Sequence, residues 1–360
     1  MKPGFFRSLF PTPEFLRMPS AGLDISDKSV RFLCFAEKNG VFTIGKYSEE
    51  KINPGIVESG KIKDEHRMKI VLAELKRKHK LNFVRVSLPE EQAYLFPMNI
   101  PIVSKKEIRE NISFQLEEHI PLNVSDVVFD YEIIRENADG YVVQVSAVHS
   151  ELVESYARIF TESGLFPVSF EVEAQAISRA AVREGDLGTV MVVDFGHTRT
   201  GISVVSGRVV VFTSTIEIGG WKLSKAFEED FSADTEEAEK IKRSRGIELD
   251  EADGKNPKKV MSVISALCDE INKRFLYWHN RKEPIDIISS PIEKIILCGG
   301  ESNTRGFPEY LARSMRIPVE IAGVWANAPF PEHYIPEIPF NDSLTYATAI
   351  GLALADSKHG

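Results

Sequence analysis

Two aspartates in this sequence stand at the ends of apolar segments and are followed by small or hydroxyl residues. Asp24 precedes Ser26 and Ser29, and Asp194 precedes Gly196. A carboxylate at a strand end can hold Mg²⁺ through its water ligands, and the backbone amides of the following turn can bind phosphate oxygens. Two such turns on opposite walls of a cleft would hold a nucleotide's phosphates and its Mg²⁺ from both sides.

Another motif, GVFTIGKY at 40–47, comes close to the phosphate-binding sequence G-x-x-x-x-G-K-[ST]. Tyr47 stands where that sequence has the Ser or Thr that holds Mg²⁺. The intervening VFTI predicts a strand after a hairpin turn at Asn39-Gly40, and no helix follows to complete a phosphate cradle. We therefore exclude a P-loop at this position.

The hydrophobic pattern predicts similar surroundings for the two aspartate turns. Around Asp24 it predicts a β-hairpin, then a helix over 64–80 and a strand over 83–88. Around Asp194 it predicts a strand, a turn, a second strand, a turn at Ser206-Gly207 and a third strand. The chain therefore has the pattern of a diverged duplication.

Two stretches interrupt this pattern. The first predicts an α-β-β-α module whose opening helix starts with the capping box Ser104-x-x-Glu107, and the second is polar, charged and helical. Later signals are a strand over 294–298, a helix from about Phe307 and a closing helix from Leu344 to Asp356. The expected division is an apolar tail (1–19), a first lobe (20–88 with 168–187 and 343–360), its inserted module (89–167), a second lobe (188–227 with 284–342) and its insertion (228–283).

Composition and charge exclude several classes of protein. The formal net charge is −9 and the pI about 5.6, which gives no electrostatic footprint for nucleic acid. No apolar run approaches the roughly 18–20 residues of a membrane-spanning helix, and the N-terminus lacks a signal peptide's apolar region, so we expect a cytoplasmic protein. The three cysteines and eight histidines are scattered, which predicts reduced thiols and no structural metal.

The first 19 residues combine four prolines with several phenylalanines and leucines. The prolines exclude a long helix. Two interpretations stay open: an arm that packs on its own domain or is disordered, and a segment that docks on a membrane surface or a partner.

Five motifs in order resemble those of the actin-like ATPase superfamily, which includes actin, sugar kinases and heat-shock chaperone ATPases. They are GLDISDKSVRF, FEVEAQAISRAA, VVDFGHTRTGISVV, KIILCGGESNTRGFPEYL and YATAIGLAL. Within the superfamily the chain most resembles the PilM family of type IV pilus assembly, on SKKEIRENISFQLEEHIPLNVSDVVFDYEII, IEIGGWKL, EINKRFLYW and RIPVEIAGVWAN. The inserted module also resembles that of FtsA, a divisome protein, but FtsA ends in a membrane-binding helix, whereas only Ser-Lys-His-Gly follows Asp356 here.

The resemblance implies an α/β fold with duplicated actin-like (ribonuclease H-like) lobes around a nucleotide cleft, an inserted α+β module in the first lobe and a helical insertion in the second. It implies ATP and Mg²⁺ as ligands, with Asp24 and Asp194 orienting the metal through water. The other implied contacts are Ser26, Ser29, Gly196, His197 and Thr198 around the phosphates; Gly219, Gly220, Gly299, Gly300 and Glu301 along the nucleoside; and Glu270 and Arg274 at the ribose and adenine. Ser26, His197 and Arg199 depart from the residues of many relatives, which predicts altered or weak nucleotide affinity.

By the same resemblance, Glu173 positions the attacking water for at most slow ATP hydrolysis, and its alternative is a polar residue that merely faces the cleft. The implied function is a cytoplasmic ATP-binding adaptor, peripheral at the inner membrane, that binds the N-terminal cytoplasmic peptide of a PilN-like inner-membrane protein. Helix 104–119 and the strand near 127–131 are the expected walls of that groove, with Phe114 off the buried face of the helix. The alternatives are an actin-like small-molecule kinase and an FtsA-like cytoskeletal or divisome ATPase.

Overall fold

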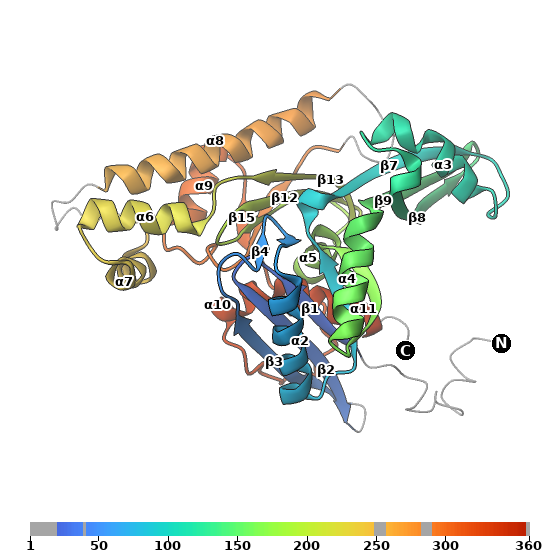
Figure 1. Cartoon of the computed structure of the whole chain (residues 1–360). Helices are drawn as coiled ribbons and strands as arrows, with labels where there is room; N and C mark the ends of the chain where they lie inside the picture. The colour runs from blue at the N-terminus through green and yellow to red at the C-terminus, as the bar shows by residue number, and fades with distance from the viewer. Residues whose placement is uncertain (1–19, 39–40, 248–256, 282–289, 358–360) are drawn as a thin grey trace.

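A computed structural model describes residues 20–38, 41–247, 257–281 and 290–357 (Figure 1). The apolar tail and the expected turn at Asn39-Gly40 lie outside these residues. Over the described part of the chain, no helix has both the length and the apolar character needed to cross a bilayer.

The first lobe is built on a five-stranded sheet in the order β10-β6-β1-β2-β3. Its strands are β1 (Ser20–Ile25), β2 (Ser29–Lys38), β3 (Val41–Lys51), β6 (Phe83–Leu88) and β10 (Phe166–Val172). The strand β3 contains residues 41–47 of the near-match to a P-loop, so this part of the motif is extended as predicted. A two-stranded ribbon, β4 (Val57–Glu58) and β5 (Lys61–Ile62), precedes the helix predicted over 64–80.

Two helices complete the core of the first lobe. The predicted helix over 64–80 is confirmed as α2 (Glu65–His79). The Asp64 side chain caps its first turn, and Lys80 ends it in a left-handed conformation. Its residues Met68, Leu72 and Leu75 are buried in the same core as those of α4 (Ser150–Glu162). The helix α4 therefore packs with the first lobe.

The second lobe repeats the first. Its sheet has the order β13-β12-β11-β14-β15. Its strands are β11 (Thr189–Phe195), β12 (Thr200–Ser206), β13 (Val209–Ile216), β14 (Lys294–Cys298) and β15 (Val319–Ile321). Read in reverse, this order is that of the first sheet, with β11, β12, β13, β14 and β15 in the places of β1, β2, β3, β6 and β10. The shared order confirms the duplicated fold.

The inserted module contains one more strand than predicted. Its sheet has the order β7-β9-β8, with β7 (Ala93–Pro101), β8 (Val127–Asn137) and β9 (Gly140–His149). Pro97 and Pro101 weaken the strand signal of β7, and both are tolerated because β7 is an edge strand. The helix α3 (Ile108–His119) covers this sheet and starts at Ile108 instead of 104, since the Glu107 carboxylate accepts the Ser104 N–H and hydroxyl in a preceding turn.

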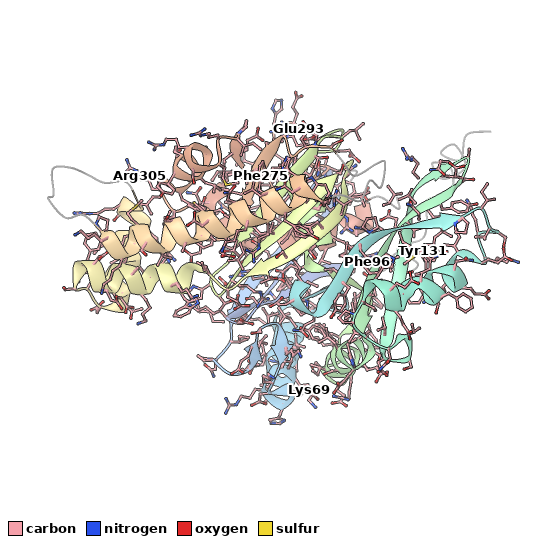
Figure 2. The ribbon with its side chains drawn as sticks, turned by 90° about the horizontal axis from the view of Figure 1, so that it is seen from above. Lys69, Phe96, Tyr131, Phe275, Glu293 and Arg305 are labelled. Atoms are coloured by element: carbon pink, nitrogen blue, oxygen red, sulfur yellow. The ribbon has the colours of Figure 1, made fainter. Side chains whose placement is uncertain are left out.

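Helices of the second lobe and its insertion cover one face of the second sheet (Figure 1). The helix α6 (Gly220–Phe231) begins in the lobe segment 188–227, α7 (Thr235–Arg245) and α8 (Lys258–Asn280) belong to the insertion, and α9 (Phe307–Met315) packs in the same core. Two short 3-10 turns of the inserted module lie at Glu90–Gln92 (η2) and Val124–Asp126 (η3). Seen from above, the inserted module with Phe96 and Tyr131 lies at the opposite end of the molecule from Arg305 (Figure 2).

A third core lies between the lobes and contains α5 (Glu173–Ala181) and α11 (Ala347–Ser357). These helices touch through glycine: a Cβ on Gly351 would lie 1.8 Å from the Ala176 carbonyl oxygen. A Cβ on Gly22 of β1 would likewise lie 2.0 Å from the Ala349 carbonyl oxygen. The predicted closing helix over 344–356 is a 3-10 turn (Leu344–Tyr346) followed by α11, and the short helix α10 (Phe340–Ser343) precedes it.

Candidate functional site

Asp24 lies near the end of β1 and is buried. Its Oδ1 accepts a hydrogen bond from the Ser87 hydroxyl at 2.8 Å, and its neighbour across the β1–β2 ladder is Arg31. Burial raises the pKa of the Asp24 carboxyl, and the positive charges of Arg31 and Arg199 oppose that shift. This carboxylate is therefore held in place by a donor and a cation.

The turn after Asp24 is closed by its two serines. The Ser26 N–H donates to the Ser29 carbonyl at 2.9 Å, and the Ser29 N–H donates to the Ser26 hydroxyl at 3.2 Å. Between them, Asp27 accepts the Gly60 N–H at 3.2 Å. The predicted first phosphate turn is thus tight, with both serine hydroxyls at its centre.

Asp194 lies near the end of β11, the equivalent strand of the second lobe. Burial and the nearby charge of Asp24 raise the pKa of Asp194 to about 6. Gly299 backs directly onto this carboxylate: its φ is +86°, and a Cβ would lie 2.4 Å from Asp194 Oδ1. A larger residue at 299 would displace the aspartate, which explains the glycine there.

The turn after Asp194 is fixed by the start of α6. The Gly220 N–H donates to the Gly196 carbonyl at 3.0 Å, and the Trp221 N–H donates to the His197 carbonyl at 2.9 Å. A Cβ on Gly219 would lie 2.4 Å from the His197 carbonyl oxygen. The glycine pair therefore lets the helix approach the turn that carries His197 and Thr198.

Three glutamates join the two aspartates in the cleft. Glu173 begins α5, and burial together with the charges of Asp24 and Asp194 raises its pKa well above the ordinary value. Glu90 and Glu91, in η2 directly after β6, also have raised pKa values, mainly through burial. We did not predict Glu90 and Glu91 as site residues. The sequence signal that could have identified them is two acidic residues just beyond the end of a predicted strand.

Arg199 connects the two lobes at this cluster. It belongs to the turn after Asp194, and its Nη1 lies 2.7 Å from Glu91 Oε1 and 3.4 Å from Asp27 Oδ2 of the first lobe. Its charge opposes the raised pKa values of Glu173, Glu90 and Glu91 as well. The sequence showed Arg199 only as a departure from relatives.

A buried lysine that we did not predict lies beside Glu301, one of the residues predicted to line the nucleoside. Lys242 Nζ lies 3.0 Å from Glu301 Oε2 and 2.9 Å from Glu239 Oε1. His197 Nδ1 lies 3.7 Å from Glu301 Oε1, and a Cβ on Gly220 would collide with the Glu301 side chain. The sequence signal that could have identified this lysine is its spacing: Lys242 follows Ala238 by four residues, which places both on the buried face of α7.

A lysine of the first lobe acts on this group from across the cleft. Burial lowers the pKa of Lys28, and the negative charges of Glu239 and Glu301 oppose that shift. Lys28 belongs to the same turn as Ser26. The turn after Asp24 therefore lies within electrostatic range of Glu301, the residue predicted to line the nucleoside.

Residues 22–357 match the family described as type IV pilus assembly protein PilM. The chain belongs to the PilM family. The match covers both lobes and both insertions, so the whole described architecture is that of the family.

Solved structures agree with this PilM fold. A PilM–PilN type IV pilus biogenesis complex is similar with a TM-score of 0.76 at 20% identity, over 94% of this chain and 99% of that one. MreB5 of Spiroplasma citri bound to ADP gives a TM-score of 0.55 at 12% identity, over 95% and 98%. The ethanolamine utilization protein EutJ from Carboxydothermus hydrogenoformans gives 0.51 at 16% identity, over 93% and 89%. These TM-scores show a shared actin-like fold.

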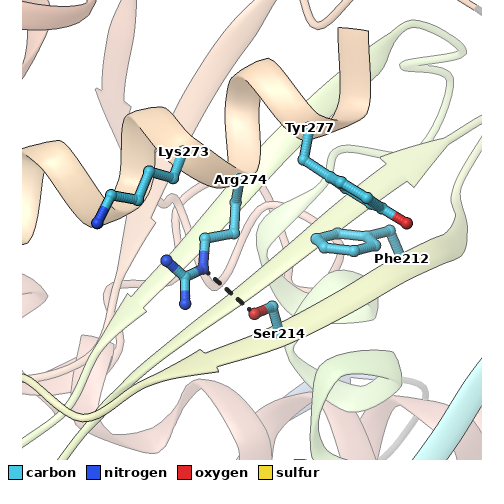
Figure 3. Close-up of a pocket in the computed structure, with 5 residues that line it drawn as sticks. All are labelled: Phe212, Ser214, Lys273, Arg274 and Tyr277. Atoms are coloured by element: carbon cyan, nitrogen blue, oxygen red, sulfur yellow. Dashed lines mark hydrogen bonds between the residues drawn. The ribbon is translucent and has the colours of Figure 1, made fainter. Parts of the chain in front are cut away.

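Glu270 and Arg274 lie apart from the other predicted site residues of this PilM-family chain. Arg274 pairs with Glu270 on α8 and approaches the Ser214 hydroxyl of β13 at 3.4 Å (Figure 3). Ser214 lies opposite Ile202 on the neighbouring strand, and Ile202 faces the core under α8. In β11 the residues on either side of Asp194, Val193 and Phe195, face that core, so the Asp194 side chain points to the other face of the sheet. The pair therefore lies on the face of the second sheet opposite the Asp194 side chain, beside a pocket of about 290 Å³.

The donor set of the cleft suits a hydrated cation. Among the described residues, no three Asp, Glu, His or Cys side chains are arranged to hold a metal ion by themselves. The cluster is nevertheless rich in carboxylates, and Glu90 Oε1 is buried without a hydrogen-bond partner in the described structure. Such an arrangement fits Mg²⁺ bound through water and phosphate oxygens, the usual coordination of Mg²⁺ beside nucleotides.

Proposed function

We propose that this PilM-family chain is a nucleotide-binding adaptor of type IV pilus assembly, located in the cytoplasm and peripheral to the inner membrane through its partner. The observation that carries the nucleotide site is the pairing of Asp24 and Asp194 on equivalent strands of the two lobes. Their charges act on each other and on Glu173, which supports one shared site for the three carboxylates.

The balance of charge supports a metal–nucleotide ligand. Five buried or half-buried carboxylates share the cations Arg199 and Arg31, and burial raises the pKa of each carboxyl. When bound, Mg²⁺ supplies positive charge to the phosphates and to these carboxylates. Asp24 and Asp194 would hold its water ligands, and the turns at 26–29 and 196–199 would surround the phosphates.

We assign the nucleoside end to Glu239, Lys242 and Glu301, with Gly299 and Gly300 beside them. A carboxylate accepts hydrogen bonds from sugar hydroxyls, and a lysine donates to them. The structures of MreB5 of Spiroplasma citri were determined with ADP and with AMPPNP. Their shared fold supports a nucleotide in the corresponding cleft here.

The test is titration calorimetry with Mg²⁺-ATP on Asp24→Ala and Asp194→Ala. We expect each variant to lose measurable binding, because each change removes a carboxylate that orients the metal. Asp269→Ala, an exposed aspartate on α8, is the matched control and should bind like the unaltered chain. ATP affinity that is unchanged in both site variants would contradict the proposed site.

Hydrolysis depends on Glu173 in this proposal. Glu173 is the first residue of α5, and the charges of both aspartates act on its carboxyl. We expect Glu173→Gln to keep ATP affinity within about threefold and to abolish any slow hydrolysis, since a glutamine cannot accept the proton of the attacking water. Phosphate release that continues unchanged in this variant would show that Glu173 is not involved.

The second half of the proposal is a peptide partner. The solved relative is a complex of PilM with PilN. In the inserted module, β8 is an edge strand: its one partner among the described strands is β9. An extended peptide can add to such an edge through main-chain hydrogen bonds. Val128 and Ile133 on β8 and Phe114 on α3 are exposed apolar residues nearby in the module.

Phe114 allows a direct test, because it is 85% exposed while Ile108, Ile112 and Leu116 on the same helix are fully buried. We expect Phe114→Glu to weaken binding of a PilN-like N-terminal peptide about tenfold, with unchanged ATP affinity and thermal stability. Ile335→Glu is the matched control, since Ile335 is 84% exposed outside the module. Equal peptide binding by the two variants would exclude Phe114 from the groove.

A further inference from the structure

Arg199 belongs to the second phosphate turn, yet its guanidinium is paired with carboxylates of the first lobe. Nη1 lies 2.7 Å from Glu91 Oε1 and 3.4 Å from Asp27 Oδ2, and the side chain is only 16% exposed. Charges shielded from water attract each other more strongly than surface charges do. The two contacts therefore hold the walls of the cleft together.

The contact with Glu91 is close but poorly aligned. Both Glu91 carboxylate oxygens are buried, and neither has a hydrogen-bond partner among the described residues. A guanidinium that met a carboxylate in its preferred parallel geometry would supply two such bonds. This pairing leaves the hydrogen-bonding capacity of the Glu91 carboxylate unused, and the other hydrogen bond of Arg199 Nη1, to Asp27 Oδ2, is long at 3.4 Å, so a better-aligned acceptor can replace both.

A phosphate group at the proposed site would be such an acceptor. Phosphate oxygens match the donor pattern of a guanidinium, and the turn at 196–199 is the one assigned to the phosphates. Among the charged groups that act on Arg199, Glu173 has the largest effect. Glu173 is also the residue assigned to the water beside the terminal phosphate.

We propose that Arg199 exchanges partners when ATP binds, leaving Glu91 and Asp27 for the terminal phosphate. The inference rests on the nucleotide site proposed above. It makes Arg199 a positioning residue that recognises the third phosphate. The exchange also removes two ion pairs between the lobes, so the contact across the cleft depends on which nucleotide is bound.

The two sides of the ion pair provide the test, with ATP and ADP affinities measured by calorimetry in the presence of Mg²⁺. Arg199→Gln removes the phosphate contact, so we expect ATP to bind about 10- to 100-fold more weakly and ADP to change less than threefold. Glu91→Gln removes a competing partner, so we expect ATP to bind about three- to tenfold more tightly. Arg199→Lys keeps the charge and should recover part of the ATP affinity.

Arg31→Gln is the control for loss of charge alone. Arg31 lies near both aspartates but pairs with Glu49 of its own lobe at 2.7 Å. We expect its effect to be equal for ATP and ADP. Thermal unfolding will first establish that each variant is folded, and Arg199→Lys replaces Arg199→Gln if the latter is not.

Opposite shifts in Arg199→Gln and Glu91→Gln support the exchange. Weaker ATP binding in both variants would show that the ion pair only holds the site together, which overturns this inference and leaves the nucleotide site standing. Failure of the unaltered chain to bind ATP would instead overturn both proposals.

Discussion

The two lobes have the same strand order but differ at the residue opposite the aspartate. In the first lobe Asp24 faces Arg31 across the β1–β2 ladder, and in the second lobe Asp194 faces Gly201 across β11–β12. A Cβ on Gly201 would lie 3.3 Å from Glu90 Oε2 of the first lobe. The glycine thus makes room for a carboxylate where the first lobe has a cation.

This difference shows how a duplicated fold produces two unequal halves of one site. The first aspartate has its own countercharge and hydrogen-bond donor, whereas the second has a pKa raised to about 6. The positive charge of the second lobe comes from Arg199, one turn away. The strands preserve the shared geometry, and the turns provide different chemistry.

The largest expected effect comes from the packing behind each aspartate strand. Gly22→Ala should lower the free energy of unfolding by about 3 kcal/mol, because the added Cβ would lie 2.0 Å from the backbone of α11. The equivalent position of the second lobe is Val192, which is buried, and Val192→Ala should cost about 2 kcal/mol through lost packing. Urea unfolding measures both, and a neutral Gly22→Ala would show that α11 can move away from β1.

A smaller effect should separate the aspartates by pH. The folded pKa of Asp194, about 6, lies above its unfolded value of roughly 3.9, so its ionisation disfavours folding as pH rises from about 4 to 6. Without Mg²⁺, Asp194→Asn should therefore stabilise the protein at pH 7.5, by at most about 3 kcal/mol, and have little effect near pH 4. Asp24→Asn should gain less, since Arg31 and Ser87 stabilise its charge. Equal gains in urea unfolding would contradict the asymmetry.

The smallest effect concerns the first phosphate turn. Ser26→Gly makes this turn resemble the second one, which has Gly196, and removes the hydroxyl that accepts the Ser29 N–H. We expect a loss of about 0.5–1 kcal/mol in the free energy of unfolding, from one hydrogen bond and added chain freedom. A lower melting temperature with unchanged ATP affinity would show that Ser26 stabilises the turn and does not contact the nucleotide.

Local signals in the sequence were sufficient for much of the fold. The hydrophobic spacing over 64–80 predicted α2, and the apolar run before Asp194 predicted the strand that positions it. The strand β7 was missed because its prolines are compatible with an edge strand only in the context of β9, which lies some fifty residues later. Such pairings depend on tertiary structure and leave little trace in a short window.

The site itself shows the same division. The aspartates follow from strand and turn patterns, but Lys242 becomes part of the site only through the packing of α7 beside Glu301. The placement of Arg274 depends on which face of the second sheet α8 covers, and nothing in the local pattern of that helix specifies it. Contacts between elements distant in sequence account for both differences.

The helices α5 and α11 lie beside both crossings of the chain between the lobes. The chain passes from the first lobe to the second just after α5 and returns just before α11. The two helices touch where Gly351, which has no side chain, lies against the backbone of Ala176. Both crossings therefore adjoin one tightly packed helix pair, whereas the Arg199 ion pairs join the lobes at the aspartate cluster.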